Sequence, residues 1–187
     1  MMSESLIEFA GYFAIKDLLL MKRTGGLEFL VGDSPIALHN DRQFGPYGNI
    51  GLAVQAIQIN LPISPELSLA YWCETLLSDM EQRLALAKKL LDQAKAWTVL
   101  GRPDLAAGAA KDRDQLAAQI AHSEALFGAF KDRRAIDCDD EQVTHYNSLQ
   151  IGNAERWLFS RNGDFQLAER MIADNSKFRS GRRVTMN

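Results

Sequence analysis

The chain has 187 residues, of which 47% are hydrophobic and 24% are charged. This length fits one domain, or one domain with a helical appendage, and it allows the chain to bury a core of its own. The formal net charge is −3, from 24 acidic and 21 basic residues, so no overall positive field would attract nucleic acid or an anionic membrane.

The cysteines and the apolar runs indicate in which cellular compartment the protein is expected. Cys73 and Cys138 lie far apart in sequence, which matches neither a disulfide framework nor a zinc-binding pattern. The apolar runs are shorter than the roughly 20 residues that cross a bilayer, and residues 1–8 lack the basic start of a signal peptide. We therefore expect a cytoplasmic protein without a membrane partner. Residues 176–187 are basic and polar, which predicts a disordered tail or, alternatively, an arm that contacts phosphate or nucleic acid.

The first third of the chain predicts a helix followed by strands. Residues 4–15 have the spacing of a short amphipathic helix. Residues 18–21 and 27–31 are apolar and flank Gly25-Gly26, a pattern typical of a β-hairpin. Asp33-Ser34-Pro35 predicts a turn or bulge, because proline cannot donate to a strand ladder, and residues 36–38 continue the strand. Residues 39–51 are rich in Gly, Pro and Asn and predict a long loop.

The middle of the chain changes from strand to helix. Residues 52–61 alternate as a half-buried strand that ends at Pro62 and Pro65, and residues 67–71 alternate again. From Glu74 the apolar spacing is helical as far as a stop at Gly101, and a second helix runs from near Pro103 to about residue 133. These two helices predict an antiparallel hairpin over residues 75–133.

The last third predicts a helix that starts at residues 137–141, a strand at residues 156–160 and a short helix at residues 165–173. We therefore expect an α+β fold, with a small, mainly antiparallel sheet built from residues 17–72 and the strand near residue 157, packed with helices. Residues 1–175 would form a single domain, and the long helical hairpin at about residues 75–133 would be inserted in it.

Three short motifs resemble those of the bacterial domain of unknown function 4238 family. Residues 31–36 (Val-Gly-Asp-Ser-Pro-Ile) resemble its Thr-Ser-Asp-Asn-Pro-Val element, and residues 62–65 (Pro-Ile-Ser-Pro) resemble its Pro-Leu-Ser-Pro element. Asn147 with residues 156–160 (Arg-Trp-Leu-Phe-Ser) resembles its helical Asn and Arg-aromatic strand. The family's His-x-x-Pro-Gln-like opening has no counterpart before Leu6, so we expect a truncated or divergent member. The resemblance implies no established activity.

Asp33 allows two interpretations. Its carboxylate can accept a backbone N–H within its own turn, which explains Asp, Ser and Pro together. Alternatively, it lies at a strand end and faces a pocket as a general base or metal ligand. The second interpretation needs partners. Glu141 and His145 share a helix face and could bind a metal, but they are more typical of a solvated pair, and no second ligand cluster is visible.

Two functional hypotheses follow. The first is a non-enzymatic interaction or accessory protein whose helical hairpin contacts a protein partner or a second copy of the chain. The second is a hydrolase or nuclease-like enzyme in which Asp33, Asn147 and Arg156 converge on one pocket as catalytic residues. His39 could be functional, but its position beside Asn40 and Asp41 is more typical of an exposed turn. The sequence names no cofactor, and the scarcity of catalytic groups favours the first hypothesis.

Overall fold

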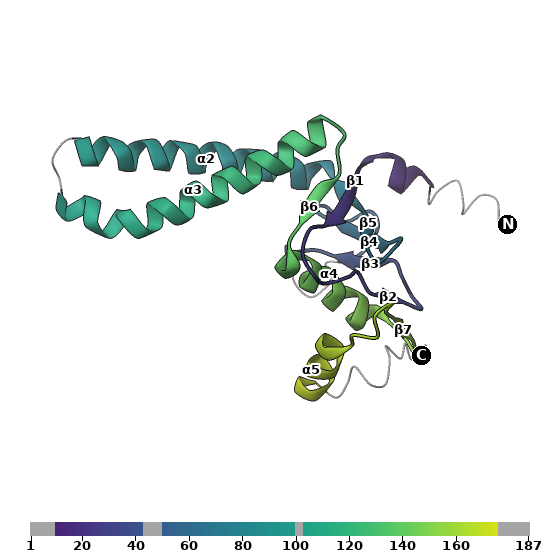
Figure 1. The fold of residues 1–187 in the computed structure, drawn as a ribbon. Coiled ribbons are helices and arrows are strands. Elements are labelled where there is room, and N and C mark those ends of the chain that lie inside the picture. Colours follow the sequence, from purple (N-terminus) through teal and green to yellow (C-terminus); the bar gives the residue numbers. More distant parts are fainter. Residues whose placement is uncertain (1–9, 43–49, 100–102, 176–187) are drawn as a thin grey trace. The chain divides into compact units, whose positions relative to one another are not determined.

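The computed structural model describes residues 10–42, 50–99 and 103–175, and these form an α+β fold (Figure 1). The strands are β1 (Lys16–Arg23), β2 (Val31–Gly32), β3 (Ala37–His39), β4 (Gln58–Pro62), β5 (Leu67–Cys73), β6 (Ile136–Cys138) and β7 (Leu158–Phe159). The long helices are α2 (Glu74–Val99) and α3 (Pro103–Lys131), and the shorter ones are α4 (Asp140–Asn153) and α5 (Gln166–Asp174). Residues 10–14 are also helical.

The main sheet has five strands in the order β3-β4-β5-β1-β6. All neighbours are antiparallel except β1 and β6, which are parallel. The sheet has one buried face. In strand β5, Ser68, Ala70 and Trp72 are buried while the residues between them are only partly buried, because successive side chains of a strand point to opposite faces. The α+β class and the mainly antiparallel sheet predicted from the sequence are therefore confirmed.

The late strand lies in a different sheet from the one we predicted. Strand β7 pairs antiparallel with β2, and the two form a separate two-stranded sheet. The fifth strand of the main sheet is instead β6, which pairs with the end of β1. Strand β6 has only three residues between two helical segments, too few for an alternating pattern to be visible in the sequence.

The predicted hairpin at Gly25-Gly26 is wrong. Strand β1 already has β5 on one edge and β6 on the other, so no edge remains for residues 27–31. Of those residues only Val31 is in a strand. Gly25 instead allows a close approach, because a Cβ atom there would lie 2.1 Å from a carboxylate oxygen of Asp140.

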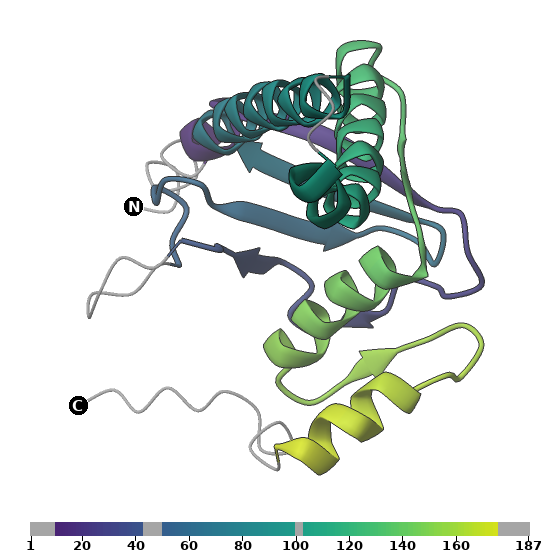
Figure 2. The same ribbon diagram turned by 90° about the vertical axis from the view of Figure 1, so that its left-hand side faces the viewer.

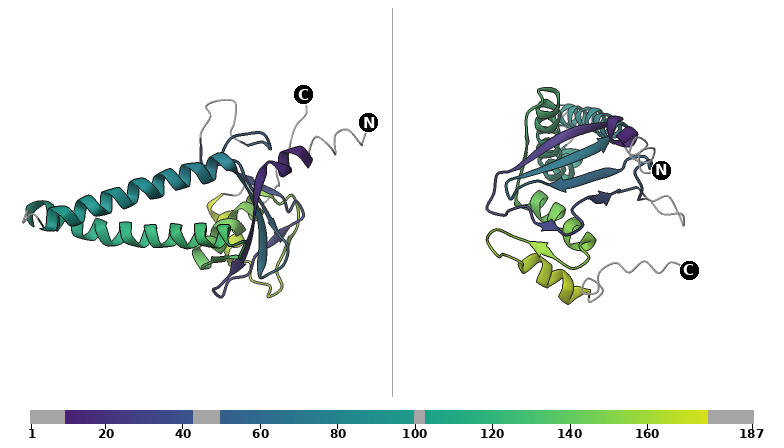
Figure 3. Two further views of the ribbon diagram at one scale, coloured as in Figure 1. Left: turned by 90° about the horizontal axis from the view of Figure 1, so that it is seen from above. Right: turned by 90° about the vertical axis from the view of Figure 1, so that its right-hand side faces the viewer.

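The described chain divides into two compact units. Unit 1 (Met1–Glu74 with Ala135–Asn187) contains both sheets, α4 and α5, and unit 2 (Thr75–Arg134) contains α3 and nearly all of α2. In unit 1, α4 lies between the main sheet and α5 and contacts both (Figure 2). In unit 2, α2 and α3 run side by side (Figure 3), and an ion pair joins Lys88 Nζ to Glu124 Oε1 at 2.7 Å.

The helices predicted from Glu74, Pro103, residues 137–141 and residue 165 are all present, with small shifts at their ends. The predicted stop at Gly101, most of the loop at residues 39–51 and the basic tail lie outside the described residues. None of the described helices combines the length and the hydropathy needed to cross a membrane.

Candidate functional site

Helix α4 is fixed at its first turn by a reciprocal pair of hydrogen bonds. The N–H of Gln142 donates to Asp139 Oδ1 at 2.9 Å, and the N–H of Asp139 donates to Gln142 Oε1 at 3.0 Å. This capping box satisfies two N–H groups that a helix start otherwise leaves free. The helix therefore begins at a defined residue directly after β6, which sets the direction of every later side chain on it.

The inward face of α4 carries two buried amides, Asn147 and Gln150, with exposed fractions of 5% and 1%. Asn147 accepts the N–H of Leu30 at 2.8 Å and donates to the carbonyl of Glu28 at 2.9 Å. Gln150 accepts the N–H of Gly32 at 3.1 Å and donates to the carbonyl of Pro35 at 2.8 Å. These side chains supply the hydrogen bonds that a neighbouring strand would otherwise supply.

Two further side chains extend this contact in both directions along α4. Asp140 Oδ1 accepts the N–H of Leu27 at 2.9 Å. Asn153 Nδ2 donates to the carbonyls of Ser34 at 2.7 Å and Ile36 at 3.0 Å. We call Asp140, Asn147, Gln150 and Asn153 the α4 clamp. The clamp pairs backbone groups of residues 27–36 with helix side chains, which is the pairing that the predicted hairpin strand at residues 27–31 would have made with β1.

Asp33 binds a distant segment of the chain. Its Oδ1 accepts the N–H of Glu155 at 2.8 Å, and its Oδ2 accepts the N–H of Arg156 at 2.9 Å. Its own N–H donates to the carbonyl of Trp157 at 3.0 Å. Loss of hydration acts to raise the pKa of this carboxyl, but the backbone N–H groups around it outweigh that effect and lower its pKa. Asp33 is therefore an ionised link between β2 and the residues that follow α4.

Glu28 is a buried carboxylate that the sequence analysis did not select. It is 6% exposed, and it accepts hydrogen bonds from the hydroxyl of Ser160 and from the N–H of Asn162, the latter at 3.0 Å. Burial acts to raise its pKa, but these donors, with the N–H and the charge of Arg161, lower it. The only signal in the sequence is one charge between Leu27 and Phe29 in an apolar run.

Arg156 is exposed and lines a pocket of about 220 Å³. This pocket is lined by Ile151, Ala154, Glu155, Arg156, Trp157, Leu158, Ala168 and Ile172. Asn147 lines a different pocket, and Asp33 lines neither of the two. Asp33 reaches Arg156 only through the main chain. The catalytic grouping of Asp33, Asn147 and Arg156 stays a prediction.

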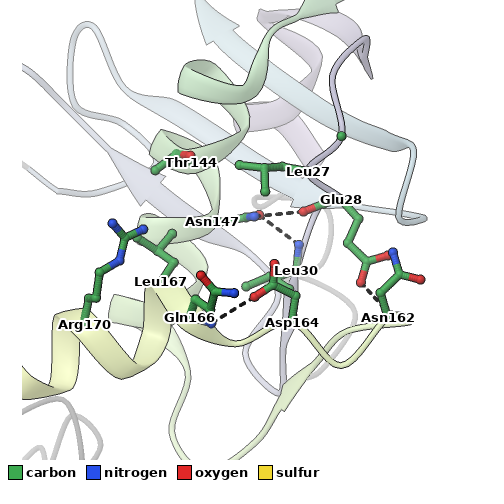
Figure 4. Close-up of a pocket in the computed structure, with 11 residues that line it drawn as sticks. Leu27, Glu28, Leu30, Thr144, Asn147, Asn162, Asp164, Gln166, Leu167 and Arg170 are labelled. Carbon is green, nitrogen blue, oxygen red and sulfur yellow. Dashed lines mark hydrogen bonds between the residues drawn. The ribbon is translucent and has the colours of Figure 1, made fainter.

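The pocket that Asn147 lines lies between α4, α5, residues 26–30 and residues 162–164 and has a volume of about 160 Å³ (Figure 4). We call it the α4–α5 pocket. Its lining residues are Gly26, Leu27, Glu28, Leu30, Thr144, Asn147, Asn162, Asp164, Gln166, Leu167 and Arg170. Asp164 and Arg170 bring charges of opposite sign to it. The Oδ1 atom of Asp164 accepts the N–H of Gln166 at 3.1 Å.

The fold also brings two histidines together. His39 Nε2 lies 2.8 Å from Asp41 Oδ1, and the ring centroids of His39 and His145 are 5.1 Å apart. The pKa of His145 is lowered, first by burial of the ring and then by the neighbouring His39, while Asp41 acts in the opposite direction. Within the described ranges, no group of three or more His, Cys, Asp or Glu side chains could hold a metal ion.

Cys138 is not suited to nucleophilic chemistry. Burial, with the nearby charges of Asp139 and Asp137, raises the pKa of its thiol to about 11. A thiol needs to ionise before it attacks or binds a metal, so this side chain remains a protonated core residue at neutral pH.

The chain belongs to the family of proteins of unknown function DUF4238, whose family model matches residues 1–164. This match confirms the resemblance that the motifs at residues 31–36, 62–65 and 156–160 indicated. No curated protein and no solved structure shows a significant match to the chain. The family description names no activity.

Proposed function

We propose that this member of the DUF4238 family is a non-enzymatic interaction protein that associates through α2 and α3. The observation that carries the proposal is a pair of leucines on α2. Leu86 and Leu90 are 57% and 47% exposed, and their spacing of four residues places them on one face of the helix. Two neighbouring exposed leucines form a small apolar patch, and such a patch serves as a contact surface when a partner covers it.

The proposal takes α2 and α3 as an antiparallel hairpin. Only three residues separate Val99, the end of α2, from Pro103, the start of α3, and such short connections favour antiparallel neighbours. The ion pair between Lys88 and Glu124 supports this pairing. At about 100° per residue, Leu86 and Leu90 each point roughly 160° away from Lys88. Pairing with α3 through the Lys88 side therefore leaves both leucines uncovered.

The partner that we propose is a second copy of the chain. Two helical hairpins can pack as a four-helix bundle, and twofold symmetry is the commonest arrangement of soluble oligomers. A symmetric contact on this face would remove four leucine side chains from water. Complete burial of one leucine is worth roughly 1.5 to 3 kcal/mol, and these side chains are already about half buried, so covering all four is worth roughly 3 to 6 kcal/mol to the contact.

The test is the molar mass in solution of three proteins, measured by sedimentation equilibrium over a range of concentrations. We expect the wild type to self-associate and the Leu86→Glu, Leu90→Glu double variant to be monomeric. Ile63→Glu is the matched control, because Ile63 is 50% exposed and lies in unit 1, and it should behave as wild type. A monomeric wild type, or a double variant that associates as tightly as wild type, would contradict the proposal.

The alternative is a hydrolase or nuclease-like enzyme with its site near Asp33. It has less support, because both carboxylate oxygens of Asp33 accept backbone N–H groups and both amide atoms of Asn147 bind the backbone of Glu28 and Leu30. A general base or metal ligand needs a lone pair directed at its substrate or metal. The remaining lone pairs of the Asp33 carboxylate are the only ones left for such a role, and the amide of Asn147 is held by the backbone on both sides.

A further inference from the structure

We propose that the α4–α5 pocket binds a small zwitterion, such as a free α-amino acid with a short side chain. Arg170 would bind the carboxylate of this ligand, and Asp164 would bind its ammonium group. The proposal concerns unit 1 and does not depend on association through α2 and α3.

The buried floor of the pocket is already fixed by contacts within the protein. The side-chain amide of Asn147 hydrogen-bonds to the backbone of Glu28 and Leu30. The Glu28 carboxylate is held by Ser160 and by the N–H of Asn162. These groups set the shape of the pocket, so the chemistry available to a ligand comes from the side chains around its opening.

Asp164 and Arg170 provide that chemistry from two different elements (Figure 4). Asp164 precedes α5 and uses Oδ1 for the N–H of Gln166, which leaves Oδ2 available. In the described part of the chain neither Asp164 nor Arg170 has an ion-pair partner, although both line the same small space. A molecule that carries both charges can satisfy the two residues at once, because a guanidinium binds carboxylates in a bidentate fork and a carboxylate binds ammonium.

The size of the pocket restricts the ligand. One water needs roughly 10 to 15 Å³ of such space, so about 160 Å³ corresponds to roughly 11 to 16 waters and holds a small molecule of about ten heavy atoms or fewer. This is below the roughly 300 to 1,000 Å³ of pockets for drug-sized ligands, and it is too small for a nucleotide. Glycine, alanine and serine have the right charge pattern and a fitting size.

The experiment is isothermal titration calorimetry of the full chain with glycine, L-alanine and L-serine. Acetate and methylamine, which each carry one of the two charged groups, are titrated for comparison. We expect at least one amino acid to bind, with an affinity about tenfold or more higher than that of acetate or methylamine. Arg170→Met and Asp164→Asn should each weaken its binding by about tenfold or more.

The variants are chosen to keep the fold. Asparagine at position 164 retains an oxygen for the N–H of Gln166, and methionine at position 170 retains an apolar stem. Thermal unfolding checks that both variants fold as wild type does. Glu169→Gln is the control, because Glu169 lies on α5 outside the pocket lining, and it should bind as wild type does. The proposal is overturned if none of the three amino acids binds, if acetate or methylamine binds as tightly, or if the folded variants bind as wild type.

Discussion

Helix α4 in unit 1 and helix α2 in unit 2 use their side chains in opposite ways. On α4 the buried positions include the amides of Asn147 and Gln150, which hydrogen-bond to backbone groups of residues 28–35. On α2 the leucines at positions 86 and 90 remain exposed. Polar residues thus hold the fold in unit 1, whereas exposed apolar residues on α2 form the surface that we propose for contact in unit 2.

This difference changes how the motif residues are interpreted. Asp33 and Asn147 are the kinds of side chain that suggest catalysis in a sequence. In the fold, each makes at least two hydrogen bonds to backbone groups of another segment. A buried amide or a carboxylate with several N–H donors is a structural element in its own right, because its removal leaves those backbone groups unpaired.

The largest effect is expected for Asn147→Ala. This change leaves the N–H of Leu30 and the carbonyl of Glu28 without their partner in a buried site. We expect the free energy of unfolding to fall by roughly 2 to 5 kcal/mol, measured by urea denaturation.

The control for this change is Ser148→Ala, since the Ser148 hydroxyl donates only to the carbonyl of His145 in its own helix. Its effect should stay within about 1 kcal/mol. If Asn147→Ala were no more destabilising than Ser148→Ala, the α4 clamp would not hold residues 27–36, and the contrast between α4 and α2 would fail.

A smaller effect is expected for Glu28→Gln, which tests the ionised carboxylate next to the clamp. The pKa of Glu28 is lowered in the fold from its ordinary value of 4.5, so the ionised form stabilises the folded state above pH 4.5. This contribution is lost as the pH falls from 4.5 through the lower pKa of the folded state. The variant should have a lower melting temperature at pH 7 and a flatter melting profile below pH 4.5. If Glu28→Gln had the same melting temperature as wild type at every pH, the ionised carboxylate of Glu28 would not stabilise the fold.

A similar but weaker acid dependence is expected for Asp33, which is exposed. Its pKa is lowered from 3.8, so its contribution is present above pH 3.8 and is lost as the pH falls through the pKa of the folded state. Asp33→Asn should lower the melting temperature at pH 7 and should not abolish amino-acid binding in the α4–α5 pocket, which Asp33 does not line. A variant as stable as wild type would leave Asp33 free for a catalytic role.

The smallest effect is expected at His145, on the exposed side of the same helix. Its pKa lies below 6.5 in the fold, so the unfolded chain binds this proton more tightly. Stability from this group is complete above pH 6.5 and declines as the pH falls from 6.5 through the folded pKa. Histidine ring signals in an NMR titration should place the His145 midpoint below 6.5, and His39→Gln should move it upward. A midpoint at or above 6.5 would contradict the burial of the His145 ring, and a midpoint that His39→Gln does not move would contradict the close approach of the two rings.

The sequence predicted the elements whose apolar pattern recurs over many residues. The helices from Glu74 and Pro103 and the alternating strand at residues 67–71 are long enough for their periods to be visible. Strand β6 was missed because it has three residues. Residues 27–31 were assigned to a hairpin because they are apolar and follow two glycines, but the edges of β1 are taken by β5 and β6.

The candidate sites were less predictable for a physical reason. Asp140, Gln150 and Asn153 resemble the polar residues of any solvated helix, and their role depends on the backbone that the fold brings to them. Asn147 was selected only through the family resemblance. Asp164 and Arg170 lie in a loop and a short helix, and nothing in their spacing predicts a shared pocket.

The most direct test of the central claim is amide hydrogen exchange at Leu30, measured by NMR. Leu30 lies outside the regular strands, and its N–H donates to the side chain of Asn147. We predict that this amide exchanges as slowly as the amides of β5 in wild type and that Asn147→Ala speeds its exchange relative to β5. Fast exchange at Leu30 in the wild type, or slow exchange that Asn147→Ala does not change, would contradict the claim that α4 side chains hold this segment.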